Sequence, residues 1–162
     1  MRSVSKKVIL TGSFAVGKTS LVSQFVYRKF PESYKTTLGV RIDKKVVELD
    51  EVKINMIIWD IGGEQSQLRI PDSYYLGSSG VIYVFDLSRP ASFLNMAENI
   101  DYIRQKLPNV PIIIVGNKLD LLDERTFKQI QAILPIPADF FTSALHGDNV
   151  EDMFLELAHQ IV

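Results

Sequence analysis

Short apolar runs alternate along this chain with segments in which apolar residues recur every three or four positions. Strands are predicted at residues 6–11, 38–49, 52–60, 81–86, 111–115 and 138–142. The runs at 81–86 and 111–115 are nearly continuously apolar, which is typical of parallel strands buried on both faces. Only Asp50 and Glu51 separate the second strand from the third, so we expect an antiparallel hairpin there.

The helical segments lie between these strands, at residues 19–29, 91–107 and 124–134, with a last helix at the end of the chain. Asp148 can cap the last helix, with Glu151 three residues further on. Its apolar face consists of Val150, Met153, Phe154, Leu157 and Ile161. The alternation predicts an α/β fold with a six-stranded, mostly parallel sheet, one antiparallel strand, and helices on both faces. Ligands of such sheets bind at the carboxyl ends of the strands.

Length and charge restrict the possible functions. The 162 residues suit one domain over residues 1–162. The net charge of −1 gives no electrostatic reason to expect binding to nucleic acid or to an acidic membrane surface. Cysteine is absent and Arg2 stands where myristoylation needs glycine, so we expect no lipid anchor on this chain. No apolar run is long enough to span a bilayer, and we expect a monomeric, cytoplasmic protein.

Residues 12–19 read GSFAVGKT and match the pattern G-x-x-x-x-G-K-[ST]. The segment follows an apolar run and leads into a helical pattern, which is the context that a phosphate-binding loop needs. Its glycines let backbone N–H groups converge on phosphate oxygens, and the helix N-terminus adds a favourable dipole. Lys18 would then reach the β- and γ-phosphates, and the Thr19 hydroxyl would bind Mg²⁺.

Residues 117–120, NKLD, directly follow the predicted strand at 111–115 and Gly116. At the carboxyl end of a strand, the Asp120 carboxylate can accept hydrogen bonds from N1–H and the exocyclic amine of guanine. Adenine offers neither donor at those positions, so a site of this kind can reject the wrong base by roughly 10⁴–10⁵. Asn and Asp in a loop are often only turn formers. The phosphate-loop motif in the same chain favours the base-binding interpretation.

Together these motifs resemble those of the Ras-like small GTPases, and the match covers the whole chain in motif order. The chain looks most like the Rab branch, because YYLG at 74–77, VIYVFD at 81–86 and TLGV at 37–40 are typical of it. The resemblance implies a small G domain of the P-loop NTPase fold. It also implies binding of GTP and GDP with Mg²⁺, slow hydrolysis of GTP, and two switch loops that read the γ-phosphate.

By this resemblance, Thr37 is the switch I threonine, whose hydroxyl binds Mg²⁺ and whose N–H meets the γ-phosphate. The alternative is an ordinary loop rich in threonine, since Thr36 is adjacent. Phe30 would pack edge-on to the guanine and Tyr34 would close over the phosphates. Either aromatic could equally be a packing residue of a folded loop.

Residues 59–65, WDIGGEQ, match the D-x-x-G motif of the same family. Asp60 would hold a Mg²⁺-bound water, and Gly63 would offer its N–H to the γ-phosphate without a side chain in the way. Residues 142–144, TSA, resemble the loop whose N–H groups contact the guanine carbonyl. The full predicted nucleotide site is Ser13, Ala15, Val16, Gly17, Lys18, Thr19, Ser20, Phe30, Tyr34, Thr37, Gly63, Asn117, Lys118, Asp120, Ser143, Ala144 and Leu145. The predicted metal ligands are Thr19, Thr37 and Asp60, and the predicted catalytic residues are Lys18, Thr37, Gly63 and Glu64.

The chain departs from the family pattern at several of these positions. Glu64 stands where the family usually has the glutamine that orients the attacking water. Its carboxylate cannot donate a hydrogen bond and adds negative charge, which opposes catalysis, yet it can act as a general base. Phe14 occupies a loop position that is often glycine, where a ring would crowd an arginine inserted by an activator. Ile61 and Gly62 are closer to the Arf and Roc branches.

Three functions compete on this basis. The first is a GTPase switch that signals through switch I and switch II to effectors, with an exchange factor and an activator as further partners. The second is a nucleotide-locked binding module with little intrinsic hydrolysis, which Glu64 and Phe14 make plausible. The third is a Roc-like G domain excised from a larger protein, which residues 59–63 favour.

Overall fold

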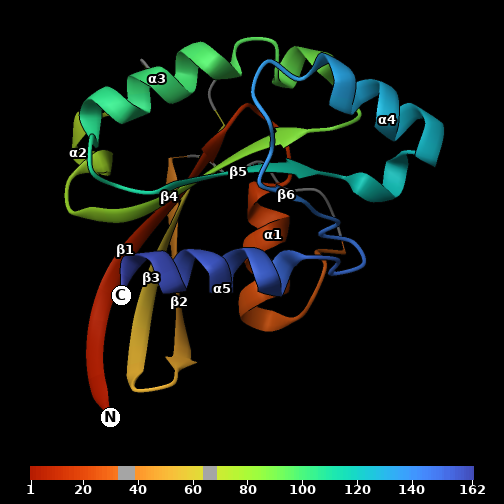
Figure 1. Cartoon of the computed structure of the whole chain (residues 1–162). Coiled ribbons are helices and arrows are strands. Elements are labelled where there is room, and N and C mark those ends of the chain that lie inside the picture. Colours follow the sequence, from red (N-terminus) through yellow and green to blue (C-terminus); the bar gives the residue numbers. More distant parts are fainter. Residues whose placement is uncertain (33–38, 64–68) are drawn as a thin grey trace.

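A six-stranded sheet in the order β2-β3-β1-β4-β5-β6 forms the centre of the protein (Figure 1). The structure is a computed structural model that describes residues 1–32, 39–63 and 69–162. The strands are β1 Arg2–Gly12, β2 Val40–Leu49, β3 Val52–Ile61, β4 Ser78–Asp86, β5 Ile112–Asn117 and β6 Phe140–Phe141. β2 pairs with β3 in antiparallel fashion and the other neighbouring strands are parallel. The predicted sheet and hairpin are therefore confirmed.

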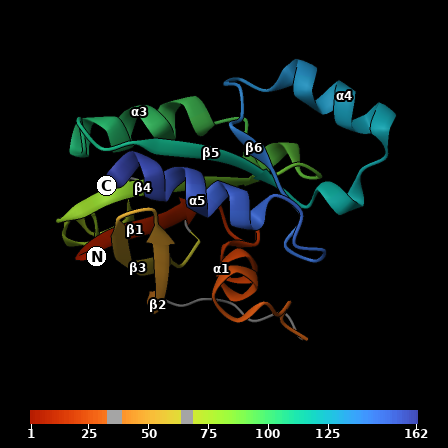
Figure 2. The ribbon, with the colours of Figure 1, turned by 60° about the horizontal axis from the view of Figure 1, so that its bottom comes forward.

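Helices cover both faces of this sheet, as predicted. They are α1 Lys18–Tyr27, α2 Asp72–Tyr75, α3 Met96–Lys106, α4 Glu124–Ile133 and α5 Val150–Ile161, with the short 3-10 helices η2 Pro90–Ser92 and η3 Leu119–Leu121. Figures 1 and 2 show α1 and α5 on one face and α3 and α4 on the other. Within the described ranges, no helix is long and apolar enough to cross a membrane.

Each face of the sheet has its own hydrophobic core. Under α1 and α5, Phe25 and Phe154 stack with ring centroids 3.9 Å apart. The residues predicted to form the apolar face of α5 are all buried in this core. On the other face, Phe85 and Phe93 meet edge to face at 5.5 Å. The two cores fix the sheet from both sides and thereby fix the loops at the carboxyl ends of its strands.

Several predicted boundaries were wrong. β1 begins at Arg2 because its polar first half pairs with β3 from Val52 onward, and this pairing outweighs the polar composition. The predicted helix at 91–107 is divided in the structure into the short 3-10 helix η2 and the helix α3, which begins only at Met96. Asp148 does not cap α5: the N-cap is Asn149 at φ 60°, with no side-chain cap hydrogen bond. The Asn149 amide instead donates to the Phe141 carbonyl at 2.8 Å.

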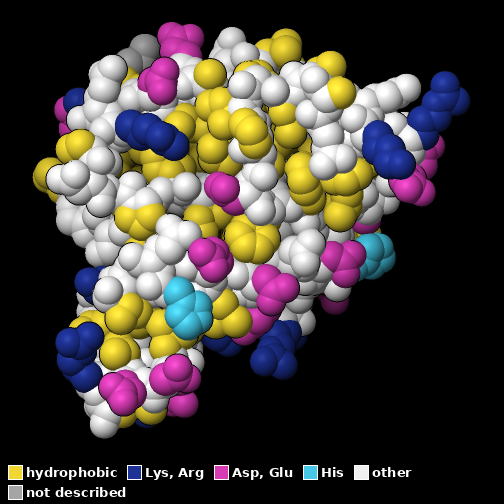
Figure 3. Space-filling view, in the orientation of Figure 1, with side chains coloured by type: hydrophobic (Ala, Val, Ile, Leu, Met, Phe, Trp, Pro, Cys, Tyr) yellow, Lys and Arg dark blue, Asp and Glu magenta, His cyan; other side chains and the backbone are white. Residues whose placement is uncertain are grey.

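Helix α4 is attached to the rest of the protein more loosely than the other long helices. None of its residues is buried, whereas α1, α3 and α5 each have several buried residues. Phe127 and Ile130 are half-buried against the core on that face, and Ile133 remains exposed. Figure 3 shows hydrophobic side chains still visible between α3 and α4. The N-terminus of α4 is well capped, since the Asp123 carboxylate accepts a hydrogen bond from the Thr126 N–H at 2.7 Å.

Candidate functional site

The loop between β1 and α1 carries the phosphate-binding motif, and two of its glycines are required by close approach. Gly12 has φ +149°, and a Cβ there would lie 2.1 Å from the Val84 carbonyl oxygen. Gly17 has φ +98°, and a Cβ there would lie 2.3 Å from Nδ2 of Asn117. Any side chain at either position would therefore push the loop away from the sheet or from the loop after β5.

Successive carbonyl oxygens of the phosphate loop accept hydrogen bonds from side chains outside the motif. The bonds run from the Arg89 guanidinium to Phe14, from Lys118 Nζ to Ala15 at 2.9 Å, and from Asn117 Nδ2 to Val16 at 3.0 Å. No cis peptide occurs among the described residues, so each following N–H points the opposite way from its bonded carbonyl. The N–H groups of Ala15, Val16 and Gly17 thus face away from these three side chains, and such an arrangement suits an anion.

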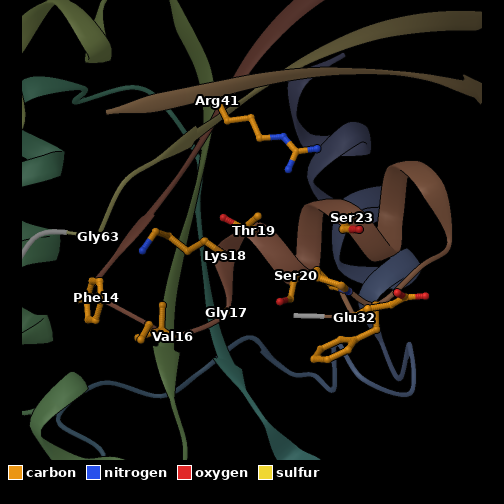
Figure 4. A pocket seen from close by; sticks show the side chains of 13 residues that line it. Phe14, Val16, Gly17, Lys18, Thr19, Ser20, Ser23, Glu32, Arg41 and Gly63 are labelled. Atoms are coloured by element: carbon orange, nitrogen blue, oxygen red, sulfur yellow. The ribbon is translucent and has the colours of Figure 1, made fainter. Parts of the chain in front are cut away.

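A pocket of about 570 Å³ lies beside this loop (Figure 4). Its described lining residues are Phe14, Ala15, Val16, Gly17, Lys18, Thr19, Ser20, Ser23, Phe30, Pro31, Glu32, Arg41 and Gly63. Lys18 is only 5% exposed, and its Nζ donates to the carbonyls of Gly12 at 3.2 Å and Ser13 at 2.9 Å. An ammonium held in this way lies next to the N–H groups of the loop and adds positive charge to the same site.

Asp60 and Thr19 form the part of the site that suits a divalent cation. Asp60 is the last residue but one of β3 and is fully buried, and the Thr19 hydroxyl donates to its Oδ2 at 2.6 Å. The other oxygen, Oδ1, is buried without a hydrogen-bond partner among the described residues. Burial is the main cause that raises the pKa of Asp60, against smaller lowering effects from Thr19, Lys18 and Arg41. A carboxylate and a hydroxyl are the hard oxygen ligands that Mg²⁺ prefers, so these residues fit that ion.

Gly63, which follows β3, lies against the phosphate loop. A Cβ there would come 2.5 Å from Cα of Phe14 and 2.8 Å from its backbone nitrogen. The end of β3 and the phosphate loop are therefore in backbone contact, and only glycine fits between them. The predicted partners Tyr34, Thr37 and Glu64 lie outside the described residues.

Asn117 connects the predicted base-binding loops to the phosphate loop. Besides its bond to Val16, its Oδ1 accepts from the Thr142 hydroxyl at 2.9 Å and from the Ala144 N–H at 3.3 Å. The side chain is 1% exposed, so all of its bonds are made away from water. One buried amide therefore joins the loops after β1, β5 and β6.

The neighbours of Asn117 extend this network. Lys118 has φ +68°, and its Nζ lies 3.1 Å from the Asp86 carboxylate while it also donates to Ala15. The exposed Asp120 carboxylate accepts from the Ser143 hydroxyl at 2.8 Å. Ser143 thereby fixes the orientation of the carboxylate that is predicted to read the base.

The structure does not bring every predicted residue into one cavity. Ser13, Asn117, Lys118, Asp120, Ser143, Ala144 and Leu145 are not among the described lining residues of the pocket. Phe30 lines the pocket and is 44% exposed, and Leu145 is 46% exposed. The phosphate loop and Thr19 thus line the pocket. Asp60 is fully buried outside this lining and is connected to it by the Thr19 hydroxyl. The base-binding residues adjoin the pocket through Asn117 and Lys118.

Two arginines near the phosphate loop were not identified from the sequence. Arg89 reaches the loop at Phe14 from the turn after β4, and Arg41 lines the pocket from β2. Arg41 is paired in the sheet with Asp60, so an alignment of β2 against β3 at the hairpin would have placed it beside the metal residues. Nothing in the local sequence of Arg89 indicates its contact.

A sequence model of the Ras family matches residues 7–162. The human Ras-related protein Rab-30 is 36% identical over 161 residues, which cover 96% of this chain and 79% of that protein. Ras-related protein Rab-4 of Dictyostelium discoideum is 35% identical over 161 residues, covering 96% and 78%. Ras-related protein Rab-7b of Mus musculus is 35% identical over 133 residues, covering 80% and 67%.

Proposed function

The chain belongs to the Ras family of small GTPases, in its Rab branch, and from this premise we propose that it binds GTP and GDP with Mg²⁺ and hydrolyses GTP at the pocket beside the phosphate loop. The observation that carries the proposal is the buried Asn117 amide, which holds the phosphate loop and the loops after β5 and β6 together. A ligand with both a base and phosphates is the kind of molecule that needs these loops in fixed relative positions. We further propose that residues 1–162 form one G domain and act as a monomer.

The proposed roles follow from the positions of the side chains. The N–H groups of residues 15–17 bind phosphate oxygens, and Lys18 exchanges the carbonyls of Gly12 and Ser13 for the β- and γ-phosphates. Thr19 and Asp60 would hold Mg²⁺, Thr19 with its hydroxyl and Asp60 with its carboxylate. When bound, this ion neutralises charge on the β- and γ-phosphate oxygens. Asp120, oriented by Ser143, accepts hydrogen bonds from guanine.

The remaining residues of the proposed site either are proposed from the sequence alone or lie at the edge of the site. Thr37 completes the metal ligands, Tyr34 closes over the phosphates, and Gly63 supplies an N–H to the γ-phosphate. Ser20, Phe30 and Leu145 complete the contacts with the nucleotide. Switch I and switch II would report the bound nucleotide to an exchange factor, an activator and effector proteins.

Glu64 is proposed to position the attacking water, with its carboxylate as a weak general base. If so, replacing it by alanine slows single-turnover hydrolysis. An unchanged rate in the Glu64→Ala variant would show that this carboxylate takes no part.

A nucleotide-locked binding module is the second candidate, and Phe14 supports it. Its side chain lines the pocket and is 46% exposed, so the ring stands beside the place proposed for the γ-phosphate. It could exclude an activator's arginine, a contact worth roughly 10³–10⁵ in rate.

The experiment that separates these functions is a single-turnover time course. The protein is loaded with GTP and Mg²⁺, and the bound nucleotide is separated by chromatography at intervals. Steady conversion to GDP supports the GTPase switch, and GTP retained for hours supports the locked module. Failure to retain guanine nucleotide, or retention of ATP as good as that of GTP, would overturn both. The Lys44→Gln variant, changed on the opposite face of β2, serves as a control that should match the wild type.

A further inference from the structure

Arg41 places a positive charge beside the residues that suit Mg²⁺. It lies directly opposite Asp60 in the antiparallel pair of β2 and β3. Opposed residues in such a pair point to the same face of the sheet, with Cβ atoms about 4.5–5.5 Å apart. Because the Asp60 side chain points to Thr19, the Arg41 side chain leaves the sheet on the side of the nucleotide pocket. Figure 4 shows it extending from β2 toward the start of α1.

A buried carboxylate on the same strand holds Arg41 in this position. Nε of Arg41 lies 3.1 Å from Oδ2 of Asp43, whose side chain is 6% exposed. Asp43 is fixed in turn by the Tyr27 hydroxyl, which donates to its Oδ1 at 2.7 Å. Asp43 pairs with Nε, and the Tyr27 hydroxyl also interacts with the guanidinium, which has five N–H donors in all. The donors that remain are suited to bind an anion such as a phosphate.

The charge of Arg41 also reaches the metal residues. Burial raises the pKa of Asp60, the positive charges of Lys18 and Arg41 are among the effects that lower it, and the charge of Asp43 raises it by a smaller effect. Among the described lining residues of the pocket, Lys18 and Arg41 are the cations and Glu32 is the carboxylate. A cation at this place attracts phosphate and repels a second cation, since both effects depend on the same Coulomb interaction.

We propose that Arg41 is a resident cation of the nucleotide site that supplies part of the positive charge otherwise supplied by Mg²⁺. The inference rests on the proposed binding of guanine nucleotide with Mg²⁺. Its consequence is that retention of GDP depends less on Mg²⁺ in this protein than it would with a neutral residue at position 41. Arg41 is thus a binding residue for the phosphates that weakens the coupling between nucleotide and metal.

Coupling between two ligands is reciprocal, so the proposal can be measured from the nucleotide side and from the Mg²⁺ side, and the two results must agree. The first is the rate at which a fluorescent GDP analogue dissociates in excess EDTA, divided by its rate in excess Mg²⁺. We expect this ratio to rise about tenfold in Arg41→Gln, within the range of roughly 5–150-fold that is usual for coupled ligands. The second is the Mg²⁺ concentration that gives half-maximal retention of the analogue, which should fall in the variant by about the same factor.

Matched variants separate charge at this position from charge in general. Lys44→Gln removes one positive charge three residues further along β2. Lys44 lies on the opposite face of the strand from Arg41, where it lines a different pocket with Ser5 and Asn55. It should leave the ratio unchanged. Arg41→Lys keeps the charge and should change the ratio less than Arg41→Gln does. The double variant Arg41→Gln with Asp43→Asn removes both charges of the ion pair. It takes the place of Arg41→Gln if thermal unfolding shows that the single variant is misfolded.

The results are distinguishable from a failure of the proposed function. A ratio that is the same in the wild type and in the position 41 variants, while Mg²⁺ still slows release from all of them, overturns the role of Arg41 alone. An equal rise in Lys44→Gln overturns it as well, because the effect would then be one of net charge. A wild-type protein that retains no guanine nucleotide overturns the proposed function itself.

Discussion

Replacing Asn117 by aspartate should loosen the phosphate loop while the other bonds of this side chain are kept. The new oxygen faces the Val16 carbonyl at the position where Nδ2 now donates at 3.0 Å, whereas the bonds from Thr142 and Ala144 to Oδ1 remain possible. The change removes one buried hydrogen bond and places a carboxylate against a buried acceptor, at 1% exposure. We expect the free energy of unfolding to fall by about 2–4 kcal/mol. For a domain of this size the melting temperature then falls by about 4–16 °C.

The same change should accelerate dissociation of a fluorescent GDP analogue by at least about tenfold, because roughly 1.4 kcal/mol of lost binding corresponds to that factor. Asn99→Asp is the matched control. It adds a carboxylate at another buried asparagine, whose Nδ2 now donates to the Tyr83 hydroxyl at 3.0 Å, and that hydroxyl can turn to donate instead. The control should release nucleotide at the wild-type rate. Dissociation from Asn117→Asp within twofold of the wild type, or equal acceleration by Asn99→Asp, would refute the reasoning.

Other variants test the metal residues, the base-binding residues and Phe14. Asp60→Asn removes a buried charge with one unpaired oxygen, so the nucleotide-free protein should melt a few degrees higher, and Mg²⁺ should no longer slow GDP release. A lower melting temperature would contradict this account. Ser143→Ala frees the Asp120 carboxylate and should weaken GDP binding by about tenfold, a loss of roughly 1.4 kcal/mol, in equilibrium titration; unchanged affinity would mean that Asp120 is oriented without it. Phe14→Gly opens the pocket wall and should make hydrolysis more responsive to an activator with an inserted arginine. An equal response from wild type and variant, in single-turnover assays with the activator, would exclude crowding by the ring.

The sequence predicted those parts of the site that are contiguous segments. Residues 12–19 run from the end of β1 through the expected loop into the first turn of α1, and Thr19 and Asp60 meet although they are 41 positions apart in the sequence. Both follow from motif spacing combined with the rule that the carboxyl ends of parallel strands share one edge of the sheet. The antiparallel hairpin was predictable for a similar reason, because its two-residue connection allows few alternatives.

The parts that escaped prediction depend on tertiary contacts. Arg89 has no motif around it, and its contact with Phe14 exists only because the turn after β4 ends beside the phosphate loop. The position of Arg41 beside Asp60 depends on the register of β2 against β3. An apolar pattern constrains this register only once both faces of the strands are assigned. The cap of α5 was assigned to Asp148 by its residue type, whereas Asn149 adopts a left-handed conformation that residue type alone does not specify.

The loose attachment of α4 has a consequence for motion within the protein. A helix without buried residues needs less free energy to detach than the helices that have them, so the amide hydrogens of α4 should exchange with solvent through local opening before the sheet unfolds. α4 begins at Glu124, directly after the segment that carries Asp120. Each opening therefore releases the anchor of the proposed base-binding loop on its C-terminal side. A bound base that orders this loop would slow the opening, so occupancy of the site would be visible as slower exchange in a helix that does not line the pocket.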